Sequence, residues 1–316
     1  MPATSPGPSS CAVTGANVVS FEADPTGTND STSAIDAAKT AAGVGGSIYF
    51  PSGTYRLTVL NPLAGQTINA AGAHLLGPIE IYNSNVTVCG AEIGPVAEYG
   101  VYFNGVSFTH LTNLNVHNTG NVAIFGSNGV TDSLIENSTV TSAGISGITI
   151  HANVTPLGAR NRILNNTVSG SAQINIEIWA PTSTVTGNTT YHGTMGLSIG
   201  AAPGSDVGYN HVDDARDYGI ELGAGSGSTV HDNNVDQTTG PPDGGVGIIV
   251  DRGEHNSSIL RNLVTNSAQR GIQFTLGSHD NLADSNTETG YGIVGTETHT
   301  VNNNTITHNT GSVRSL

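Results

Sequence analysis

Short segments in which aliphatic and polar residues alternate recur along most of the chain. One pattern, aliphatic-x-x-Asn-x-aliphatic, occurs for example at 163–168 and 207–212, and a second pattern, Gly-aliphatic-x-aliphatic, occurs for example at 196–199 and 219–222. Alternation with a period of two is typical of β-strands that bury one side. Copies of the first pattern begin at Leu111, Ile135, Ile163, Val185, Val207, Val230, Ile259, Leu282 and Val301.

These copies follow one another at intervals of about 22 residues, which is the repeat length of a solenoid with one coil per repeat. A single coil cannot bury its own apolar side, whereas stacked coils bury a continuous core. Leucine-rich repeats need a Leu-rich consensus and propellers need longer units, and the sequence has neither. We therefore predict an all-β fold, a right-handed parallel β-helix, in which an asparagine ladder forms at the turns and one aliphatic residue per coil stacks inside. The expected inner column is Ile148, Ile176, Leu197, Ile220, Ile248, Ile272 and Ile293.

The beginning of the chain differs from the repeats. Residues 1–17 are predicted to be an N-terminal arm, and 18–316 a single β-helix domain. A short helix is expected at 34–42, with Ile35 and Ala38 facing the core. The open end of a solenoid exposes core and strand edges, so this helix is predicted to cap it.

Charge and composition exclude several classes of protein. Only 10% of the residues are charged, against about 25% in a typical domain, and the formal net charge is −15 with Lys39 as the only lysine. A nucleic-acid-binding protein needs a basic surface, which is missing. No apolar run is long enough to span a membrane. A homo-oligomer is compatible with the sequence.

We expect a secreted protein. The first ten residues are rich in Pro and Ser and show no signal peptide, as in a mature secreted chain to which Met1 was added. Cys11 and Cys89 either form a disulfide between the arm and an early coil, which would suit an exported protein, or are two unrelated buried thiols.

The N-terminal region resembles a known family. The motifs that carry the resemblance are Phe21-Glu22-Ala23-Asp24, Asn29-Asp30-Ser31-Thr32, the Ala-rich helix and Gly45-Gly46-Ser47-Ile48-Tyr49-Phe50-Pro51-Ser52-Gly53-Thr54-Tyr55. Together they are similar to the first segment of the pectate-lyase-like, single-stranded right-handed β-helix superfamily, which includes polygalacturonase-related proteins, exo-β-1,3-glucanases and phage tailspike depolymerases. The resemblance implies the β-helix fold and a carbohydrate substrate.

The chain also departs from that superfamily. The paired-Asp, Gly-His-Gly and Arg-Ile-Lys motifs of polygalacturonases are absent, as is the pattern of alginate epimerases with a His between acidic residues. The resemblance therefore implies a substrate class more strongly than a reaction.

Acidic residues gather at outward positions of the later coils. Glu177 and Glu221 fall in one column two coils apart, and Asp251 follows on the coil after Glu221, with Glu254 in the next loop. Such a cluster is similar to the one that tailspike glycosidases use. Glycoside hydrolysis needs one carboxylic acid and one carboxylate, so these four residues are the catalytic candidates. The alternative is that they are simply solvated.

Five further residues are candidates for binding the substrate. An exposed Trp179 would stack on a sugar ring, unless it only packs against the coils. Arg252 and Arg270 would bind a carboxylate or sulfate, or act as the base of a lyase, or pair with neighbouring acids. His151 and Gln273 lie in the same outward rows. The longer coils place insertions at 152–159 and 238–245, which we expect to wall a groove.

Three functions follow from these residues. The first is a glycoside hydrolase without a cofactor. The second is a polysaccharide lyase that uses Ca²⁺ to neutralise a uronate. The third is a non-catalytic carbohydrate-binding solenoid or adhesin. The eleven histidines show no metal-ligand spacing, so no bound metal is predicted otherwise.

Overall fold

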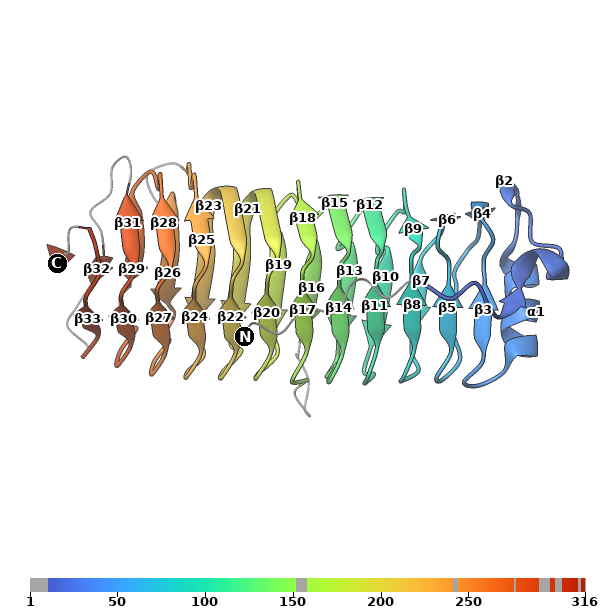
Figure 1. Cartoon of the computed structure of the whole chain (residues 1–316), viewed down its shortest axis with the longest axis horizontal. Coiled ribbons are helices and arrows are strands. Elements are labelled where there is room, and N and C mark those ends of the chain that lie inside the picture. Colours follow the sequence, from blue (N-terminus) through green and yellow to red (C-terminus); the bar gives the residue numbers. More distant parts are fainter. Residues whose placement is uncertain are drawn as a thin grey trace.

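The computed structural model shows an elongated solenoid of stacked coils with one helix at its N-terminal end (Figure 1). The structure describes residues 11–151, 158–240, 244–275, 277–289, 296–298, 303–311 and 314–315. All strand pairings between coils are parallel, as predicted for a parallel β-helix. No helix within these described ranges is long and apolar enough to cross a membrane.

Each coil contributes strands to three faces. The first face is a sheet of 13 strands. Its strands are β1 (Ala16–Asn17), β3 (Ser47–Tyr49), β5 (Thr67–Asn69), β8 (Thr87–Cys89), β11 (His110–Thr112), β14 (Leu134–Glu136), β17 (Arg162–Leu164), β20 (Thr184–Thr186), β22 (Asp206–Gly208), β24 (Thr229–His231), β27 (Ser258–Leu260), β30 (Leu282–Asp284) and β33 (Thr305–Thr307).

The second face follows the first along the chain. Its strands are β2 (Thr26–Asp30), β4 (Gly53–Arg56), β6 (Ala73–Leu76), β9 (Glu92–Ile93), β12 (Asn115–Thr119), β15 (Thr139–Ala143), β18 (Thr167–Ser169), the first halves of β21 (Thr189–Gly200) and β23 (His211–Gly223), β25 (Asn234–Asp236), β28 (Leu263–Thr265) and β31 (Thr287–Thr289).

The third face carries the second sequence pattern. Its strands are β7 (Ile79–Ile81), β10 (Val101–Asn104), β13 (Ile124–Ser127), β16 (Ile148–His151), β19 (Ile174–Trp179), the second halves of β21 and β23, β26 (Val246–Asp251), β29 (Arg270–Phe274), β32 (Thr296–Thr298) and β34 (Arg314–Ser315).

The predicted inner column is confirmed over most of its length. Successive members pair in register from Ile148 to Ile272, and all six of these side chains are fully buried. Each aliphatic residue therefore packs against its counterpart in the next coil, which is how a solenoid builds a core.

The register of the last coils was predicted wrongly. Ile272 pairs with Thr296, while the expected Ile293 lies outside the described residues. On the first face Ile259 pairs with Ala283, so Leu282 points outward instead of inward. Ala283 in turn pairs with Ile306, and the expected Val301 also lies outside the described residues. Small and polar residues occupy inner positions here, so the hydrophobic pattern no longer marks the register.

The asparagine ladder forms as expected. The side-chain amide of each member donates to the Oδ1 of the next, over 2.8–3.1 Å. Because most of these groups are buried, each unmet hydrogen bond would cost about 1–3 kcal/mol, so the ladder fixes this turn in the coils that carry it. Its members are Asn166, Asn188, Asn210, Asn233, Asn262, Asn286 and Asn309.

The N-terminal cap is confirmed. Helix α1 (Thr32–Ala42) begins two residues before the expected start, and it packs against β1, β3 and the short 3-10 helix η1 (Val18–Phe21). Ile35 and Ala38 are its buried residues. Cys11 and Cys89 form a disulfide, which ties the arm to the coil of β8.

Candidate functional site

Outward residues of the third face form a row along the solenoid. Strand pairing places one residue from each coil beside its counterpart in the next, with coils about 4.8 Å apart. We call this the central row. Its members are Glu80, Tyr102, Phe125, Thr149, Glu177, Ser198, Glu221, Ile249 and Gln273.

Glu177 is held by residues from its own coil and the preceding one. Its Oε1 accepts a hydrogen bond of 3.0 Å from Trp179 Nε1, and its Oε2 accepts one of 3.4 Å from Thr149 Oγ1. The Nε2 atom of His151 lies 3.1 Å from the same Oε2. Since the Glu177 side chain is still 14% exposed, this carboxylate is positioned yet accessible to a small molecule.

Two glycines make room beside Glu177. A Cβ atom at Gly200 would lie 2.9 Å from the indole ring of Trp179, and one at Gly223 would lie 2.2 Å from Asp251 Oδ1. Gly200 and Gly223 are neighbours in register. The ring of Trp179 and the carboxyl group of Asp251 therefore each lie over one member of this glycine pair.

Glu221 is buried, in contrast to the exposed position that we expected. Its residue exposure is 2%, its Oε2 accepts a hydrogen bond of 2.6 Å from Ser198 Oγ, and its Oε1 contacts the guanidinium of Arg252. A buried carboxylate is stable only when it is paired and hydrogen-bonded, and both conditions are met. The Arg252 side chain covers Glu221 and separates it from solvent.

Asp251 has the most unusual ionisation in the site. Burial raises the pKa of its carboxyl group to about 6, and the negative charge of Glu221 adds to the rise, while Arg252 opposes it. Arg252 Nε lies 3.5 Å from Asp251 Oδ2, whereas Oδ1 has no hydrogen-bond partner among the described residues. This carboxyl group is therefore protonated in a large fraction of molecules near pH 6.

Tyr218 is a member of the site that the sequence analysis missed. It lies on β23, three residues before Glu221, and pairs in register with Met195 and Val246. Burial raises the pKa of its hydroxyl group, and the charges of Asp251 and Glu221 raise it further. Its hydroxyl is therefore a proton-bearing group close to both acids.

Glu254 does not join the other three acids. It is fully buried in the turn after β26, where Oε2 accepts a hydrogen bond of 2.6 Å from the amide of Gly225 and Oε1 one of 2.5 Å from Ser257 Oγ. Burial raises the pKa of its carboxyl group despite these hydrogen bonds. Its geometry suits a residue that holds two turns together better than one that contacts a substrate.

The remaining candidates lie at the C-terminal side of the acids. Gln273 is in the central row beside Ile249 and is 8% exposed. Arg270 lies at the start of β29, where Nη1 donates to Gln269 Oε1 over 2.8 Å. Residues 152–157 and 241–243 of the two insertions lie outside the described residues, so the expected groove walls stay a prediction.

An aromatic run leads from the N-terminal coils to Trp179, and it too was missed. Ring centroids of consecutive members lie 5.4–6.1 Å apart. Gly100-Val101-Tyr102-Phe103 matches the second sequence pattern, so an alignment extended to this coil would have found it. The run consists of Tyr82, Tyr102, Phe125, His151 and Trp179, with Tyr99 stacked beside Tyr102 and Phe125.

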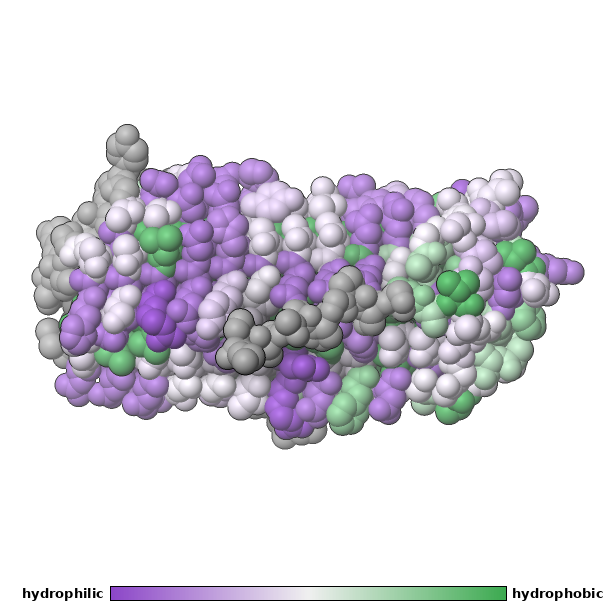
Figure 2. All heavy atoms as spheres, in the orientation of Figure 1, coloured by the Kyte–Doolittle hydropathy of each residue, from purple (hydrophilic) through white to green (hydrophobic). Residues whose placement is uncertain are grey.

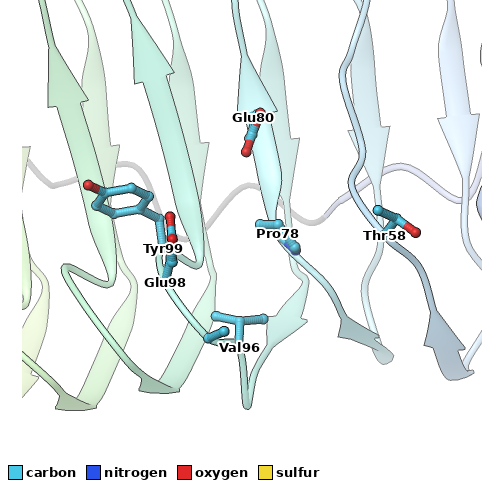
Figure 3. A pocket seen from close by; sticks show the side chains of 7 residues that line it. Thr58, Pro78, Glu80, Val96, Glu98 and Tyr99 are labelled. Carbon is cyan, nitrogen blue, oxygen red and sulfur yellow. The ribbon is translucent and has the colours of Figure 1, made fainter.

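A hollow of about 280 Å³ lies at the N-terminal end of this run. Figure 3 shows Glu98 and Tyr99 at one side of it, Pro78 and Glu80 on the neighbouring coil, and Thr58 beyond them. The Glu80 carboxylate accepts a hydrogen bond of 2.9 Å from the hydroxyl of Tyr82. The hollow therefore combines polar groups with an aromatic ring.

A family model described as a right-handed β-helix region matches residues 99–287. The chain belongs to the right-handed β-helix family. A search with the sequence gives no significant match among curated proteins. The family match confirms the fold and says nothing of the reaction.

Solved structures with this fold have diverse roles. The A-module of the Azotobacter vinelandii mannuronan C-5 epimerase AlgE6 is 16% identical with a TM-score of 0.74, covering 94% of this chain and 99% of that one. The catalytic unit of a GH87 α-1,3-glucanase from Streptomyces thermodiastaticus is 14% identical with a TM-score of 0.61. The match covers 96% of this chain and 70% of the glucanase chain. PfbA, a surface adhesin of Streptococcus pneumoniae, is 13% identical with a TM-score of 0.56. The match covers 89% of this chain and 91% of the PfbA chain. At such identities the likeness shows the fold alone.

Proposed function

We propose that this protein is a carbohydrate-active enzyme that hydrolyses a glycosidic bond, with Asp251 as the general acid. The observation that carries the proposal is the raised pKa of Asp251, about 6, in a carboxyl group that lies over the glycine pair opposite Trp179. A glycosidase needs one carboxyl group that keeps its proton near neutral pH, and burial beside another acid provides it. The glucanase and the epimerase described above, which are named for carbohydrate reactions, support the substrate class.

Glu177 is the proposed general base. Its carboxylate is fixed by Trp179 and Thr149 but retains some exposure. Glu177 and Asp251 are three coils apart, which separates their backbones by about 14 Å, and Asp251 leans back toward the coil of Glu221. Carboxyl groups of a retaining pair lie only about 5 Å apart, so this wider spacing, which leaves room for a water molecule, favours inversion.

The reaction then proceeds in one step. Glu177 takes a proton from water as the water oxygen bonds to the anomeric carbon, the bond from that carbon to the glycosidic oxygen breaks, and Asp251 delivers its proton to the leaving oxygen. Glu221 acts as a positioning residue, because it orients Arg252 and its charge helps to keep Asp251 protonated.

The substrate is proposed to be a polysaccharide or a long oligosaccharide. One sugar would lie against Trp179 and the carboxyl group of Asp251, and further sugars would stack along the aromatic run toward Tyr82. Aromatic faces provide flat apolar area that suits the C–H faces of sugar rings. The disulfide between Cys11 and Cys89 supports an extracellular location.

Two alternatives follow from the same site. A Ca²⁺-dependent lyase could hold its ion with these acids, but an arginine base is disfavoured since Arg252 contacts both Glu221 and Asp251. A non-catalytic carbohydrate-binding protein would use the aromatic run alone.

A panel of neutral and uronic acid polysaccharides tests the proposal. We expect new reducing ends without the ultraviolet absorbance of an unsaturated product, and NMR of the first products should show the inverted anomer. The Asp251→Asn variant should lose at least about 100-fold in kcat. An unsaturated product would favour the lyase, and binding without any product would favour the adhesin.

A further inference from the structure

Three potential metal-binding side chains converge on the second face, several coils N-terminal to Glu177. His74 on β6, Glu92 on β9 and His117 on β12 come from neighbouring coils, whose strands lie next to one another in Figure 1. One ligand atom from each lies within 4.8 Å of the other two. All three residues are partly buried.

Strand register explains why the three side chains meet. His74 pairs with Glu92, and Glu92 pairs with Asn115, so His117 projects outward two residues further along its strand. At the corresponding place on the coil of β9 lies Gly94, where a Cβ would be 1.9 Å from the His117 carbonyl oxygen and 3.2 Å from its Nδ1. The missing side chain lets the imidazole of His117 lean toward Glu92.

The distances suit a small tetrahedral cation. His117 Nε2 lies 3.1 Å and His74 Nε2 lies 4.0 Å from Glu92 Oε1. Ligand atoms at 2.0–2.1 Å from a tetrahedral Zn²⁺ are about 3.3 Å apart, so a small movement of side chains would bring the three atoms to bonding distance. The Glu92 side chain is 45% exposed, which allows this movement.

The surroundings support ligation in other ways. The amide nitrogen of Asn118 lies 3.1 Å from His117 Nδ1, the ring nitrogen that would not bind the ion. A zinc-bound His117 carries its proton on Nδ1, so the Asn118 amide would turn to offer its oxygen as the acceptor that orients the ring. Other histidines in the described part of the chain pair differently. His231, for example, directs Nε2 to Asp206 and Nδ1 to Asp232, on opposite sides of its ring, so those groups do not converge on one point.

We propose that His74, Glu92 and His117 bind a zinc ion that links three consecutive coils. Two imidazole nitrogens and one carboxylate oxygen form a ligand set that zinc favours over calcium, which prefers oxygen ligands only. Solvent would occupy the fourth position. His74 Nε2 contacts the carbonyl oxygen of Gly94 in the metal-free structure, and zinc would replace this contact. The site is independent of glycoside hydrolysis.

Calorimetry on protein treated with a chelator tests this site. We expect one Zn²⁺ to bind per chain and Ca²⁺ not to bind there. His74→Ala and His117→Ala should each weaken binding by more than the roughly 10- to 100-fold that loss of a supporting residue causes. Glu136→Gln, which removes the carboxylate beside His110 on the first face, is the matched control and should bind zinc like the wild type.

Cobalt provides a second measurement that does not depend on the variants being stable. Co²⁺ bound to the wild-type protein should show the intense visible absorption of a tetrahedral site, and Zn²⁺ should displace it. Absence of stoichiometric zinc binding, or binding that survives in the His74→Ala/His117→Ala double variant, would overturn the proposal. Neither result would change the prediction for Asp251, because the acid site contains no residue of the zinc site.

Discussion

The third face has two regions with the same backbone and different side chains. In the N-terminal coils the central row carries Tyr102 and Phe125, whose rings contact each other, and in the C-terminal coils it carries Glu177 and Glu221. On the side shown in Figure 2, hydrophilic residues likewise dominate the C-terminal coils, and hydrophobic ones become more frequent toward α1. In the function proposed above, binding and chemistry would therefore occupy separate coils of one solenoid.

The difference shows what the repeat does and does not determine. Inner positions are mostly aliphatic because they stack in the core, as Ile148, Ile176 and Leu197 do. Outward positions contribute little to the core, so any side chain that tolerates its neighbours can stand there. Function can therefore change from coil to coil without a change of fold.

The largest expected effect lies in the acidic region. Glu177→Gln should lower kcat by at least about 100-fold on the substrate identified, because the amide cannot accept the proton of the attacking water. Glu136→Gln is the matched control, since Glu136 also lies beside a histidine of the adjacent coil, His110, at 2.8 Å. Equal losses in both variants would show that the effect comes from folding and not from catalysis.

The aromatic region should affect binding of long chains only. Tyr102→Ala removes a ring of the aromatic run, so we expect KM for a polysaccharide to rise about tenfold, the equivalent of about 1.4 kcal/mol, with kcat unchanged. A short oligosaccharide that reaches only Trp179 should show no change. Tyr209→Ala, at an exposed tyrosine that contacts His231 on another face, serves as the control. A fall in kcat on short substrates would contradict the separation of the two regions.

Much of this arrangement was predictable from the sequence. Period-two alternation and the spacing of the repeats place Glu177 and Glu221 in one column, and Asp251 two residues further along its coil, because register in a solenoid follows from the inner residues. The same register places Trp179 against Gly200 of the next coil.

Burial of individual outward side chains was not predictable. Glu221 is covered because Arg252 folds back over it and Ser198 donates to it, and both contacts depend on side-chain conformations that a repeat pattern does not contain. The zinc-site residues were missed for a related reason. His74, Glu92 and His117 are about one coil apart along the chain, so no short motif links them.

The third prediction concerns pH and links Glu221 to Asp251. A general acid must be protonated, so turnover should fall as the pH rises above about 6, the pKa of Asp251. Glu221→Gln removes a negative charge that raises this pKa, and it also leaves Arg252 free to attract the charged form of Asp251. The alkaline limb of the pH profile should therefore move to lower pH, by about one unit. An unchanged limb would show that another group controls it.

The smallest expected effect is on stability. Its sign distinguishes an Asp251 that serves as a catalytic acid from one that stabilises the coils. The folded-state pKa of about 6 lies above the ordinary value of 3.8, so the contribution of Asp251 to stability is fully present below pH 4 and is lost as the pH rises from about 4 to 6. At pH 7 the charged group therefore destabilises the fold, by at most about 3 kcal/mol, and by less because its side chain is 17% exposed.

Asp251→Asn removes this cost, so its Tm at pH 7 should be a few degrees above that of the wild type, whereas at pH 4 the two should be nearly equal. Thermal unfolding followed by circular dichroism at both pH values measures this difference. If Asp251 is a catalytic acid that destabilises the fold, the Asp251→Asn variant should be more stable than the wild type and inactive. A variant that is less stable at pH 7 would mean that the Asp251 carboxylate stabilises the coils instead.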